Sequence, residues 1–534
     1  MTIGQRITQL RRRAGLSQEQ LAERLAVSRQ SVSKWEVDAA VPQLDKILQL
    51  TALFGITADA LLCPQEATPA PQRADGALHY FGTDGFRAEA GVGLTSMHAY
   101  RVGRFLGWYF GRGRAGGRAR IVVGKDTRRS SYMLEYSLVA GITASGADAY
   151  MLHVITTPGV SYVTRQDDFD CGIMITASHN PFYDNGIKLI NRHGEKMDDR
   201  TVALVEAYID GDMAALGLSS DELPEARREG LGCIHDYVSG RNRYIGYLIS
   251  VASHSYKHLR IGLDCANGAS FTVARAVFGA LGAKVQLLGD APDGLNINRD
   301  CGSTHIEALA RAVKEGHLDV GFAFDGDADR CLAVDGDGRV VDGDAILYIL
   351  AARLKRHGML SEDTVVATVM SNSGFVQSLA RRGIRCETTA VGDRFVYERM
   401  QEGGFHLGGE SSGHIILKKY ATTGDGLLTA IMLTEELCDT KKTLAELTEG
   451  LTVYPQLTLS VRVKDKDAVL RDGRVTRTLA EIQEAIGARG RALLRRSGTE
   501  AVVRVMVECE TPALCRRYAD RLVEVIREGG YACD

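Results

Sequence analysis

A short apolar run followed by a Gly/Asp loop and a segment of helical periodicity occurs three times between residues 120 and 381. The runs are rich in β-branched residues, as buried strands are. Strands that alternate with helices in this order are typical of α/β domains. The predicted strand and helix pairs are 120–123 with 131–145, 258–263 with 270–281, and 364–369 with 374–381. We therefore expect three α/β units in tandem.

The two ends of the 534-residue chain follow different patterns. Strands near 457–464 and 501–508 and helices near 475–487 and 511–528 predict a smaller α+β domain at the C-terminus. A chain of this length exceeds the size at which a single core keeps growing, so several domains are expected.

The first sixty-odd residues have helical spacing of apolar residues throughout, which predicts an all-α module. Ser17 with Gln20 forms a capping box, and Ser28 is placed to cap a third helix after the short turn at 26–28. Pro42 suits the first turn of a fourth helix, and Gly55 is placed to end it. The second and third helices then form a helix-turn-helix.

Three of the ten prolines, Pro64, Pro69 and Pro71, predict a semi-stiff linker after this module. The expected organisation is therefore 1–64 for the helix-turn-helix domain, 65–78 for the linker, 79–235, 236–342 and 343–452 for the three α/β domains, and 453–534 for the α+β domain.

The net charge of −3 gives no case for binding of the whole protein to nucleic acid or to a membrane. The eleven cysteines are scattered without C-x-x-C spacing, which argues against a zinc site or a disulfide framework. The N-terminus lacks an apolar signal core, and no apolar run has the length of a membrane span. We expect a cytoplasmic protein.

Ser178 lies in the hexapeptide Thr-Ala-Ser-His-Asn-Pro at 176–181, directly after a predicted buried strand at 172–175. A serine at a strand end usually caps a turn, so the hexapeptide alone is weak evidence for a nucleophile. Further along the chain come three more loops rich in functional groups, at 325–330, 409–414 and 495–500.

Asp325, Asp327 and Asp329 alternate after the apolar run 320–324, so their side chains share one face of an extended chain. Three carboxylates on one face predict a Mg²⁺ site. An EF-hand loop also begins with this pattern, but Arg330 and Gly336 occupy the positions where that loop needs glycine and glutamate.

Together the four loops resemble those of the α-D-phosphohexomutase superfamily, over residues 79–534. The resemblance implies an isomerase in which Ser178 is phosphorylated, passes its phosphoryl group to a sugar phosphate and takes the other phosphate back from a hexose bisphosphate. It also implies that Ser178 and the three aspartates hold Mg²⁺, that Arg87 and Lys188 surround the phosphoserine, and that His179 orients it. Lys188 matches a candidate general acid/base.

The same resemblance assigns substrate contacts in the other loops. The sugar hydroxyls are expected to contact Glu410, Ser412 and His414, and the phosphates to contact Arg330 and a cradle of Arg495, Ser497, Gly498 and Thr499, with Arg504 on the adjoining strand.

The segments 80–87, 295–305 and 390–394 look more like the phosphoglucosamine mutase branch than the phosphomannomutase or phosphoglucomutase branches. Three residues depart from the usual pattern, namely Ala88, Ser411 and Ala501. Ser411 replaces a glutamine in the sugar loop and leaves room for a different 2-substituent, so glucose and mannose phosphates stay open as substrates.

Residues 3–62 resemble the Cro/C1-type repressor domain, whose third helix enters the major groove of double-stranded DNA. That helix would present Arg29, Gln30, Ser33 and Lys34, with Trp35 in the core. A helical bundle for protein contact is the alternative, because eight Lys/Arg against six Asp/Glu in residues 1–64 give only +2. Two hypotheses stay open for the whole chain. It is either a working mutase with an appended domain, or a transcription regulator that senses sugar phosphates through an inactive mutase body.

Overall fold

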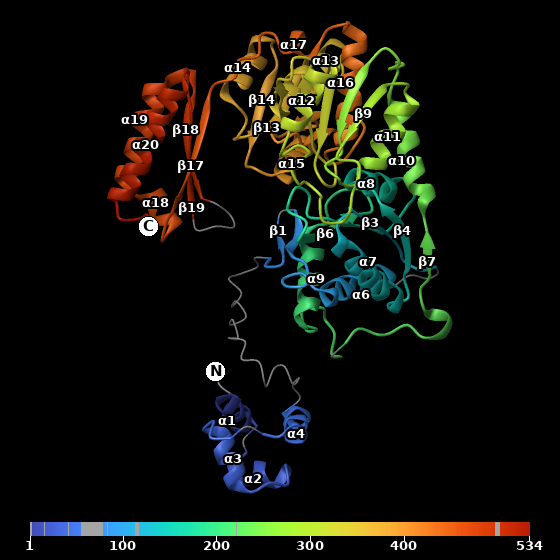
Figure 1. Cartoon of the computed structure of the whole chain (residues 1–534), viewed down its shortest axis with the longest axis vertical. Coiled ribbons are helices and arrows are strands. Elements are labelled where there is room, and N and C mark those ends of the chain that lie inside the picture. The colour runs from blue at the N-terminus through green and yellow to red at the C-terminus, as the bar shows by residue number, and fades with distance from the viewer. Residues whose placement is uncertain are drawn as a thin grey trace. The chain divides into compact units, whose positions relative to one another are not determined.

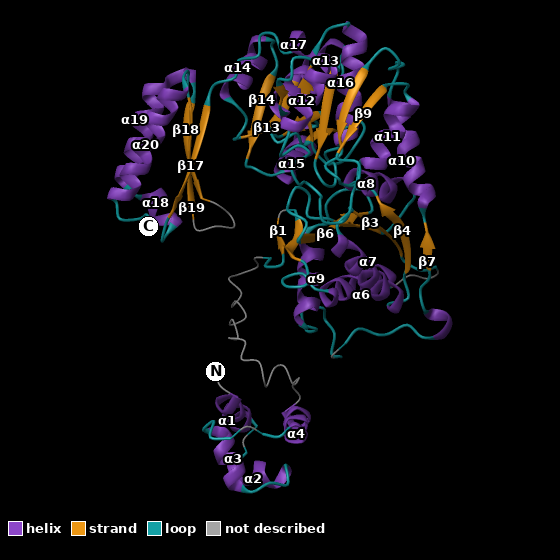
Figure 2. Ribbon diagram, in the orientation of Figure 1, coloured by secondary structure: helices purple, strands orange, loops and turns teal. Residues whose placement is uncertain are grey.

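The computed structural model divides the chain into two compact units, 1–77 and 78–534. Its described residues are 3–14, 16–40, 42–54, 78–82, 84–112, 117–220, 222–496 and 502–533. Figure 1 labels the helices and strands, and Figure 2 separates the two kinds of element by colour.

The N-terminal unit consists of α1 (Ile3–Arg13), α2 (Gln18–Arg24), α3 (Arg29–Glu36) and α4 (Leu44–Phe54). Ser17 and Gln20 form the predicted capping box, and Ser28 caps α3. The helices enclose their own core, in which Leu21, Val32 and Trp35 are buried. Pro42 lies two residues before α4 rather than in its first turn, and Gly55 lies outside the described residues.

The second unit begins with a seven-stranded sheet in the order β1-β2-β6-β5-β3-β4-β7. Its helices cover both faces, and side chains of β3 alternate between them: Ile121 and Val123 pack towards α6, α7 and α9, whereas Val122 packs towards α8. The elements of this first domain are β1 (Phe81–Gly82), β2 (Gly85–Glu89), α6 (Ser96–Gly111), β3 (Arg120–Lys125), α7 (Arg129–Ala144), β4 (Asp148–Val154), α8 (Thr157–Gln166), β5 (Cys171–Ile175), β6 (Asp184–Asn191), α9 (Asp199–Asp210), η1 (Arg228–Gly230) and β7 (Ile234–Asp236).

The second domain has a five-stranded sheet in the order β12-β11-β10-β8-β9. Strands β8, β9 and β10 are parallel, and the β10–β11 hairpin turns antiparallel through the aspartate loop. Its elements are α10 (Val238–Val251), β8 (Arg260–Asp264), α11 (Phe271–Ala280), β9 (Lys284–Leu288), α12 (Glu307–Gly316), β10 (Val320–Phe324), β11 (Cys331–Asp335) and β12 (Val340–Val341).

The third domain has a four-stranded sheet in the order β14-β13-β15-β16. One continuous hydrophobic core runs from Phe322 of the second domain to Leu433 of the third. The elements are α13 (Gly343–Arg356), η2 (Ser361–Asp363), β13 (Thr364–Thr368), α14 (Ser373–Arg381), β14 (Arg385–Thr389), α15 (Asp393–Gly403), β15 (Leu407–Gly409), β16 (Ile415–Leu417), α16 (Gly426–Thr440) and α17 (Leu444–Leu447).

The fourth domain packs helices against one three-stranded antiparallel sheet, in the order β17-β19-β18, around a separate core. Its elements are β17 (Gln456–Arg462), α18 (Lys466–Arg471), α19 (Gly473–Ile486), η3 (Gly487–Arg489), β18 (Arg491–Arg496), β19 (Val502–Glu508) and α20 (Pro512–Glu528). The sequence-based strand and helix pairs are confirmed to within a few residues, but β18 was not predicted. No helix among the described residues is long and apolar enough to cross a membrane.

Asp425 joins the second and third domains through a buried carboxylate. It caps α16 by accepting from Leu428 N at 3.0 Å, and it accepts from the hydroxyl of Tyr244 on α10 at 2.8 Å. Burial raises the pKa of Asp425 to about 6. The folded state therefore binds the proton of the Asp425 carboxyl group more tightly than the unfolded chain does. The stability that the protonated carboxyl group contributes is lost as the pH rises through 6.

We predict that Asp425→Asn raises the thermal unfolding midpoint at pH 8 and has no such effect near pH 4. Asparagine keeps an acceptor for α16 but never ionises, so it removes a cost of about 3 kcal/mol, at about 1.4 kcal/mol for each pKa unit. Calorimetry of both proteins at the two pH values measures the difference. A variant that is less stable than the wild type at pH 8 would contradict the free-energy cost that we assign to ionisation of Asp425.

Candidate active site

All four functional loops follow the C-terminal ends of strands. Ser178 comes after β5, Asp325 after β10, Glu410 after β15, and the 497–500 loop after β18. Ligands bind α/β sheets at this edge, because the loops there are free to carry functional groups. Among the described residues, the loops of the first three domains meet at one place, where Ser178, the aspartates and His414 come together.

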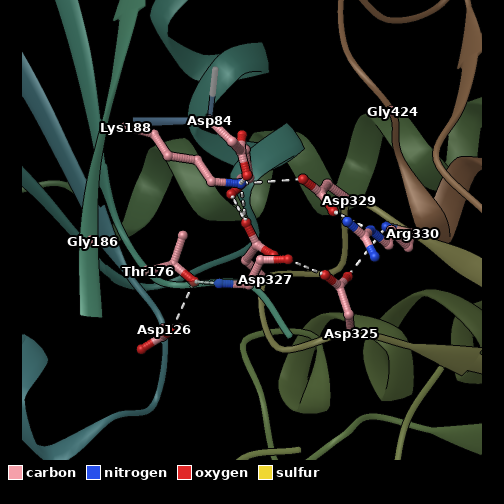
Figure 3. A network of polar contacts seen from close by, with 12 residues as sticks. Asp84, Asp126, Thr176, Gly186, Lys188, Asp325, Asp327, Asp329, Arg330 and Gly424 are labelled. Atoms are coloured by element: carbon pink, nitrogen blue, oxygen red, sulfur yellow. Dashed lines mark hydrogen bonds and ion pairs between the residues drawn. The ribbon is translucent and has the colours of Figure 1, made fainter. Parts of the chain in front are cut away.

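The Ser178 backbone is fixed in a left-handed conformation, with φ of 52°. Its N–H donates to Thr176 Oγ1 at 2.9 Å, and that hydroxyl donates to Asp126 Oδ2 at 2.7 Å. Figure 3 shows Thr176 and Asp126 in this arrangement. Non-glycine residues adopt this conformation only when their surroundings hold them there, so the serine is built into a rigid turn.

The three aspartates converge on Ser178, as the sequence predicts. Its Oγ donates to Asp325 Oδ2 at 2.6 Å, and one ligand oxygen from each aspartate lies within 4.8 Å of the others. Asp325, Asp327 and Asp329 are buried, and within the part of the chain that the structure describes the Oδ1 atoms of the last two have no hydrogen-bond partner. Hard oxygen donors with unused lone pairs fit a divalent cation such as Mg²⁺.

Charge is concentrated in this cluster (Figure 3). Burial raises the pKa of Asp325 well above its ordinary value, and the neighbouring carboxylates of Asp329 and Asp327 raise it further. Burial also acts to raise the pKa of Asp329, but the positive charges of Lys188, His414 and Arg330 together outweigh it and hold that pKa well below its usual range. Like charges this close require a cation.

Lys188 on β6 supplies one such cation. Its Nζ lies 2.8 Å from Asp327 Oδ2, 3.2 Å from Asp329 Oδ2 and 3.3 Å from Asp84 Oδ2. Burial lowers the pKa of Lys188, but these carboxylates outweigh it and hold the pKa well above its ordinary value. A raised pKa keeps Lys188 an ammonium that serves as counter-charge and hydrogen-bond donor to the carboxylates, whereas general acid/base catalysis favours a pKa near the working pH.

Arg87 reaches this group through Asp84, with which it forms an ion pair. His179 Nδ1 lies 3.3 Å from Ser178 Oγ, and burial together with the charges of Arg330 and Arg87 lowers the pKa of His179 to about 4. Its imidazole is therefore neutral near pH 7. Arg330 N–H donates to Asp325 Oδ1 at 3.2 Å, so this residue lies beside the carboxylates.

The sugar loop at 410–414 adjoins the aspartates through His414. The His414 ring lies 3.8 Å from Asp329 Oδ2 and 3.6 Å from Asp393 Oδ2. Burial lowers its pKa, but the two carboxylates outweigh it and raise the pKa to about 9. Glu410 accepts from Gly392 N at 3.1 Å, and the buried Ser412 hydroxyl has no hydrogen-bond partner among the described residues. The Ser412 hydroxyl is thus available to bind a ligand. His414 links the aspartate loop to the start of α15 through Asp329 and Asp393.

Lys196 and Asp393 complete a bridge that the sequence did not reveal. Lys196 Nζ lies 2.7 Å from Asp393 Oδ1 and 3.3 Å from Asp84 Oδ1, so the first and third domains are joined beside the site. Asp84 and Asp393 both lie inside segments that the family resemblance picks out, 80–87 and 390–394. Thr157 was also missed, although its hydroxyl donates to Asp327 Oδ2 at 2.5 Å.

In the fourth domain Arg495 and Arg504 lie side by side in register on β18 and β19. Burial, and then the charge of Arg504, lowers the pKa of Arg495. Two adjacent guanidinium groups favour an anion between them. Ser497, Gly498 and Thr499, predicted to complete this cradle, lie outside the described residues, as does Ala501.

The four residues predicted to contact DNA lie on α3 of the other unit. Arg29, Gln30 and Lys34 are exposed, Ser33 is half-buried, and Trp35 is buried as expected. Arg11 and Glu36 tie α1 to α3 through two hydrogen bonds of 2.6 and 3.0 Å. The exposed face of α3 is therefore held on a stable support.

Comparisons with known families account for both units. Residues 78–215, 242–338 and 342–454 match the phosphoglucomutase/phosphomannomutase alpha/beta/alpha domains I, II and III. Residues 459–525 match the C-terminal domain of the same family, and residues 7–61 match a helix-turn-helix family.

Curated relatives match the second unit almost end to end. A phosphoglucosamine mutase of Lachnospira eligens is 57% identical over 453 residues, which are 85% of this chain and 99% of the relative. One from Bacillus subtilis is 46% identical over 448 residues, covering 84% of this chain and 98% of the relative.

Solved structures show the same fold. A phosphoglucomutase/phosphomannomutase family protein from Burkholderia thailandensis has a TM-score of 0.69 at 24% identity, covering 85% of this chain and 98% of that one. An Aspergillus fumigatus N-acetylphosphoglucosamine mutase, solved with GlcNAc-6P and magnesium, has a TM-score of 0.60 at 18% identity, covering 86% and 97%. The chain belongs to the phosphoglucosamine mutase family of phosphohexomutases, which are isomerases, and carries an N-terminal helix-turn-helix extension.

Proposed function

We propose that this protein interconverts glucosamine 6-phosphate and glucosamine 1-phosphate through a phosphoserine at Ser178. The observation that carries the proposal is the 2.6 Å contact between Ser178 Oγ and Asp325 in a buried cluster of three carboxylates. The identity of 45–57% to phosphoglucosamine mutases supports the choice of sugar. The cytoplasm is the location we propose, on the sequence argument alone.

In the first half-reaction the phosphoryl group leaves Ser178 for the free hydroxyl of the sugar phosphate. The neighbouring Lys188 ammonium would balance the charge on the transferring group, and the Arg87 guanidinium, which Asp84 holds in place, would add a second positive group. The proton of the sugar hydroxyl needs an acceptor, and the neutral imidazole of His179, 3.3 Å from Ser178 Oγ, is a candidate for this role. In the second half-reaction the reoriented hexose bisphosphate returns its other phosphate to Ser178.

Ser178, Asp325, Asp327 and Asp329 would hold Mg²⁺, which neutralises developing charge on the phosphoryl oxygens when bound. Glu410, Ser412 and His414 would face the sugar, and Arg330, Arg495 and Arg504, with the loop 497–499, would hold phosphate. Because the bisphosphate binds in both orientations, the groups that recognise its remote end must accept either phosphate.

The Ser411 position keeps glucose and mannose phosphates as alternative substrates, because it replaces a larger glutamine in the sugar loop. The alternative of another class is a regulator that binds sugar phosphates without turnover. The presence of the serine, all three aspartates and Lys188 in one cluster favours catalysis.

We predict that Ser178→Ala lowers mutase activity by at least about a thousandfold, because the phosphoryl carrier is lost. The assay supplies glucosamine, glucose or mannose phosphate with Mg²⁺ and a trace of the matching bisphosphate, and we expect glucosamine phosphate to be used best. Ser137→Ala, which removes an exposed hydroxyl on α7, is the control. If phosphorylated wild-type protein turns over none of the three sugar phosphates, the enzyme hypothesis is wrong and the regulator hypothesis is favoured.

Asp327→Asn should weaken binding of Mn²⁺, used as a probe for Mg²⁺, by at least about tenfold, because one anionic oxygen donor is lost. Isothermal titration of the purified protein measures the affinity. Asp337→Asn, an exposed residue of the β11–β12 turn, should leave it unchanged. Equal affinities for all three proteins would place the metal elsewhere.

We also propose that residues 1–64 bind double-stranded DNA. The support is the helix-turn-helix match together with the exposed Arg29, Gln30 and Lys34 on α3, beside the half-buried Ser33. Arginine and glutamine are the side chains that read guanine and adenine edges in the major groove.

Arg29→Ala should weaken binding to a duplex that the full-length protein selects from a random pool by roughly tenfold, as expected for loss of one base contact. Arg12→Ala makes the same charge change on an exposed part of α1, and we expect it to have a smaller effect. Binding should also fall steeply with salt and vanish when residues 1–64 are deleted. Failure to enrich any duplex would favour a protein-contact module instead.

A further inference from the structure

Asn298 lies in the 295–305 segment, which the proposed chemistry leaves without a role. It belongs to the second domain, between β9 and α12, and its side chain is 93% buried, with a relative exposure of 7%. Its φ is 58°, and its N–H donates to Ala266 O at 2.8 Å. A left-handed asparagine held by its backbone presents its amide in a fixed direction.

That amide reaches across to the serine loop of the first domain. Asn298 Nδ2 donates to Ser178 O at 2.8 Å and to Asn180 O at 3.1 Å. Arg128, which follows β3, donates from Nη2 to the same two oxygens at 3.0 and 2.8 Å. Two donors from different domains therefore clamp one pair of carbonyls.

The aspartate loop packs against this clamp. A Cβ atom on Gly326 would lie 2.5 Å from Ser178 O and 3.1 Å from Asn298 Nδ2, so only glycine fits between Asp325 and Asp327. The peptide of Ser178 is thus enclosed by Arg128, Asn298 and Gly326. Any shift of this peptide displaces the serine relative to the carboxylates.

The direction of Ser178 Oγ depends on this backbone. Serine has a single side-chain torsion, so the position of its oxygen follows from χ1 and from the peptide on either side. Phosphoryl transfer needs the attacking and leaving oxygens roughly in line, and a displacement of about 1 Å can lower the rate about a hundredfold. A left-handed serine also needs outside contacts to stay in place.

We infer that Asn298 and Arg128 are positioning residues that hold the 178–180 backbone so that the Ser178 oxygen stays in line for phosphoryl transfer. The inference rests on the proposed function. Neither residue needs to touch the sugar: Asn298 acts on the two carbonyls only, through its amide N–H group. Removing it should therefore slow transfer more than it weakens substrate binding.

Asn298 is the better residue to test. Arg128 and Asp126 are both fully buried and lie 3.3 Å apart, Nε to Oδ2, so loss of the arginine would leave a buried carboxylate without its ion pair. Asn298 is uncharged, and Asn298→Leu keeps a similar side-chain size while removing the donor without adding a buried charge. Asn296 provides the control, because among the described residues its side chain bonds within its own loop, accepting from Asp293 N and donating to Ala291 O.

The experiment compares wild type, Asn298→Ala, Asn298→Leu and Asn296→Ala in full-length protein. We expect kcat to fall about 10- to 100-fold in both Asn298 variants, with KM changed less than about threefold, and Asn296→Ala to resemble the wild type. In single-turnover reactions, dephosphorylated protein is mixed with a hexose bisphosphate, and intact-mass spectrometry follows phosphorylation of Ser178. This rate should fall by the same factor as kcat.

Unchanged kcat in the Asn298 variants, an equal loss in Asn296→Ala, or a rise in KM at constant kcat would overturn the inference. Thermal unfolding of each variant identifies a loss caused by misfolding, and if Asn298→Ala does not fold, Asn298→Leu, which leaves a smaller cavity, decides. The phosphorylation step separates this inference from the proposed function. A wild type that is phosphorylated but turns over no sugar phosphate contradicts the function, whereas slow phosphorylation of the variants still supports the clamp.

Discussion

The need to balance buried negative charge organises the catalytic unit. Asp325, Asp327 and Asp329 are buried at the end of one strand of the second domain, and three carboxylates in that setting are stable only with cations beside them. The nearest ammonium, on Lys188, comes from the first domain, which also carries Ser178. Two domains therefore meet at this point because each has the charge that the other lacks.

The same charge pattern extends into the third domain. Asp84 contacts Lys188 and Lys196, Lys196 contacts Asp393, and Asp393 lies near His414 of the sugar loop. A chain of alternating charges links the sugar loop to the nucleophile without direct contact between them. In a buried network of this kind, removal of one member leaves its partners uncompensated, so the effects of single substitutions on the site should not be additive.

The sequence predicted the strands that carry the loops, because apolar β-branched runs followed by polar residues mark both a buried strand and its end. The family resemblance, rather than the local pattern, placed Ser178 and the aspartates together, because β5 and β10 belong to different sheets. The sequence did not reveal Lys196, Thr157 or Asn298, whose partners are distant in the chain and whose residue types are ordinary. It also missed β18, where Arg491 and two further arginines hide the alternation of an amphipathic strand. Packing between domains, rather than local pattern, determines these features.

The helix-turn-helix extension is an addition to a mutase unit that already has all four of its domains. Residues outside it match 99% of the length of a phosphoglucosamine mutase, and all four mutase domains are present. The small unit in turn buries Leu21, Val32 and Trp35 in a core of its own. Neither unit therefore needs the other to complete a fold or a site. The DNA binding that we propose for this extension would be a capacity separate from the mutase chemistry. An effect of bound DNA on catalysis would then act through a change in the populations of states of the mutase unit.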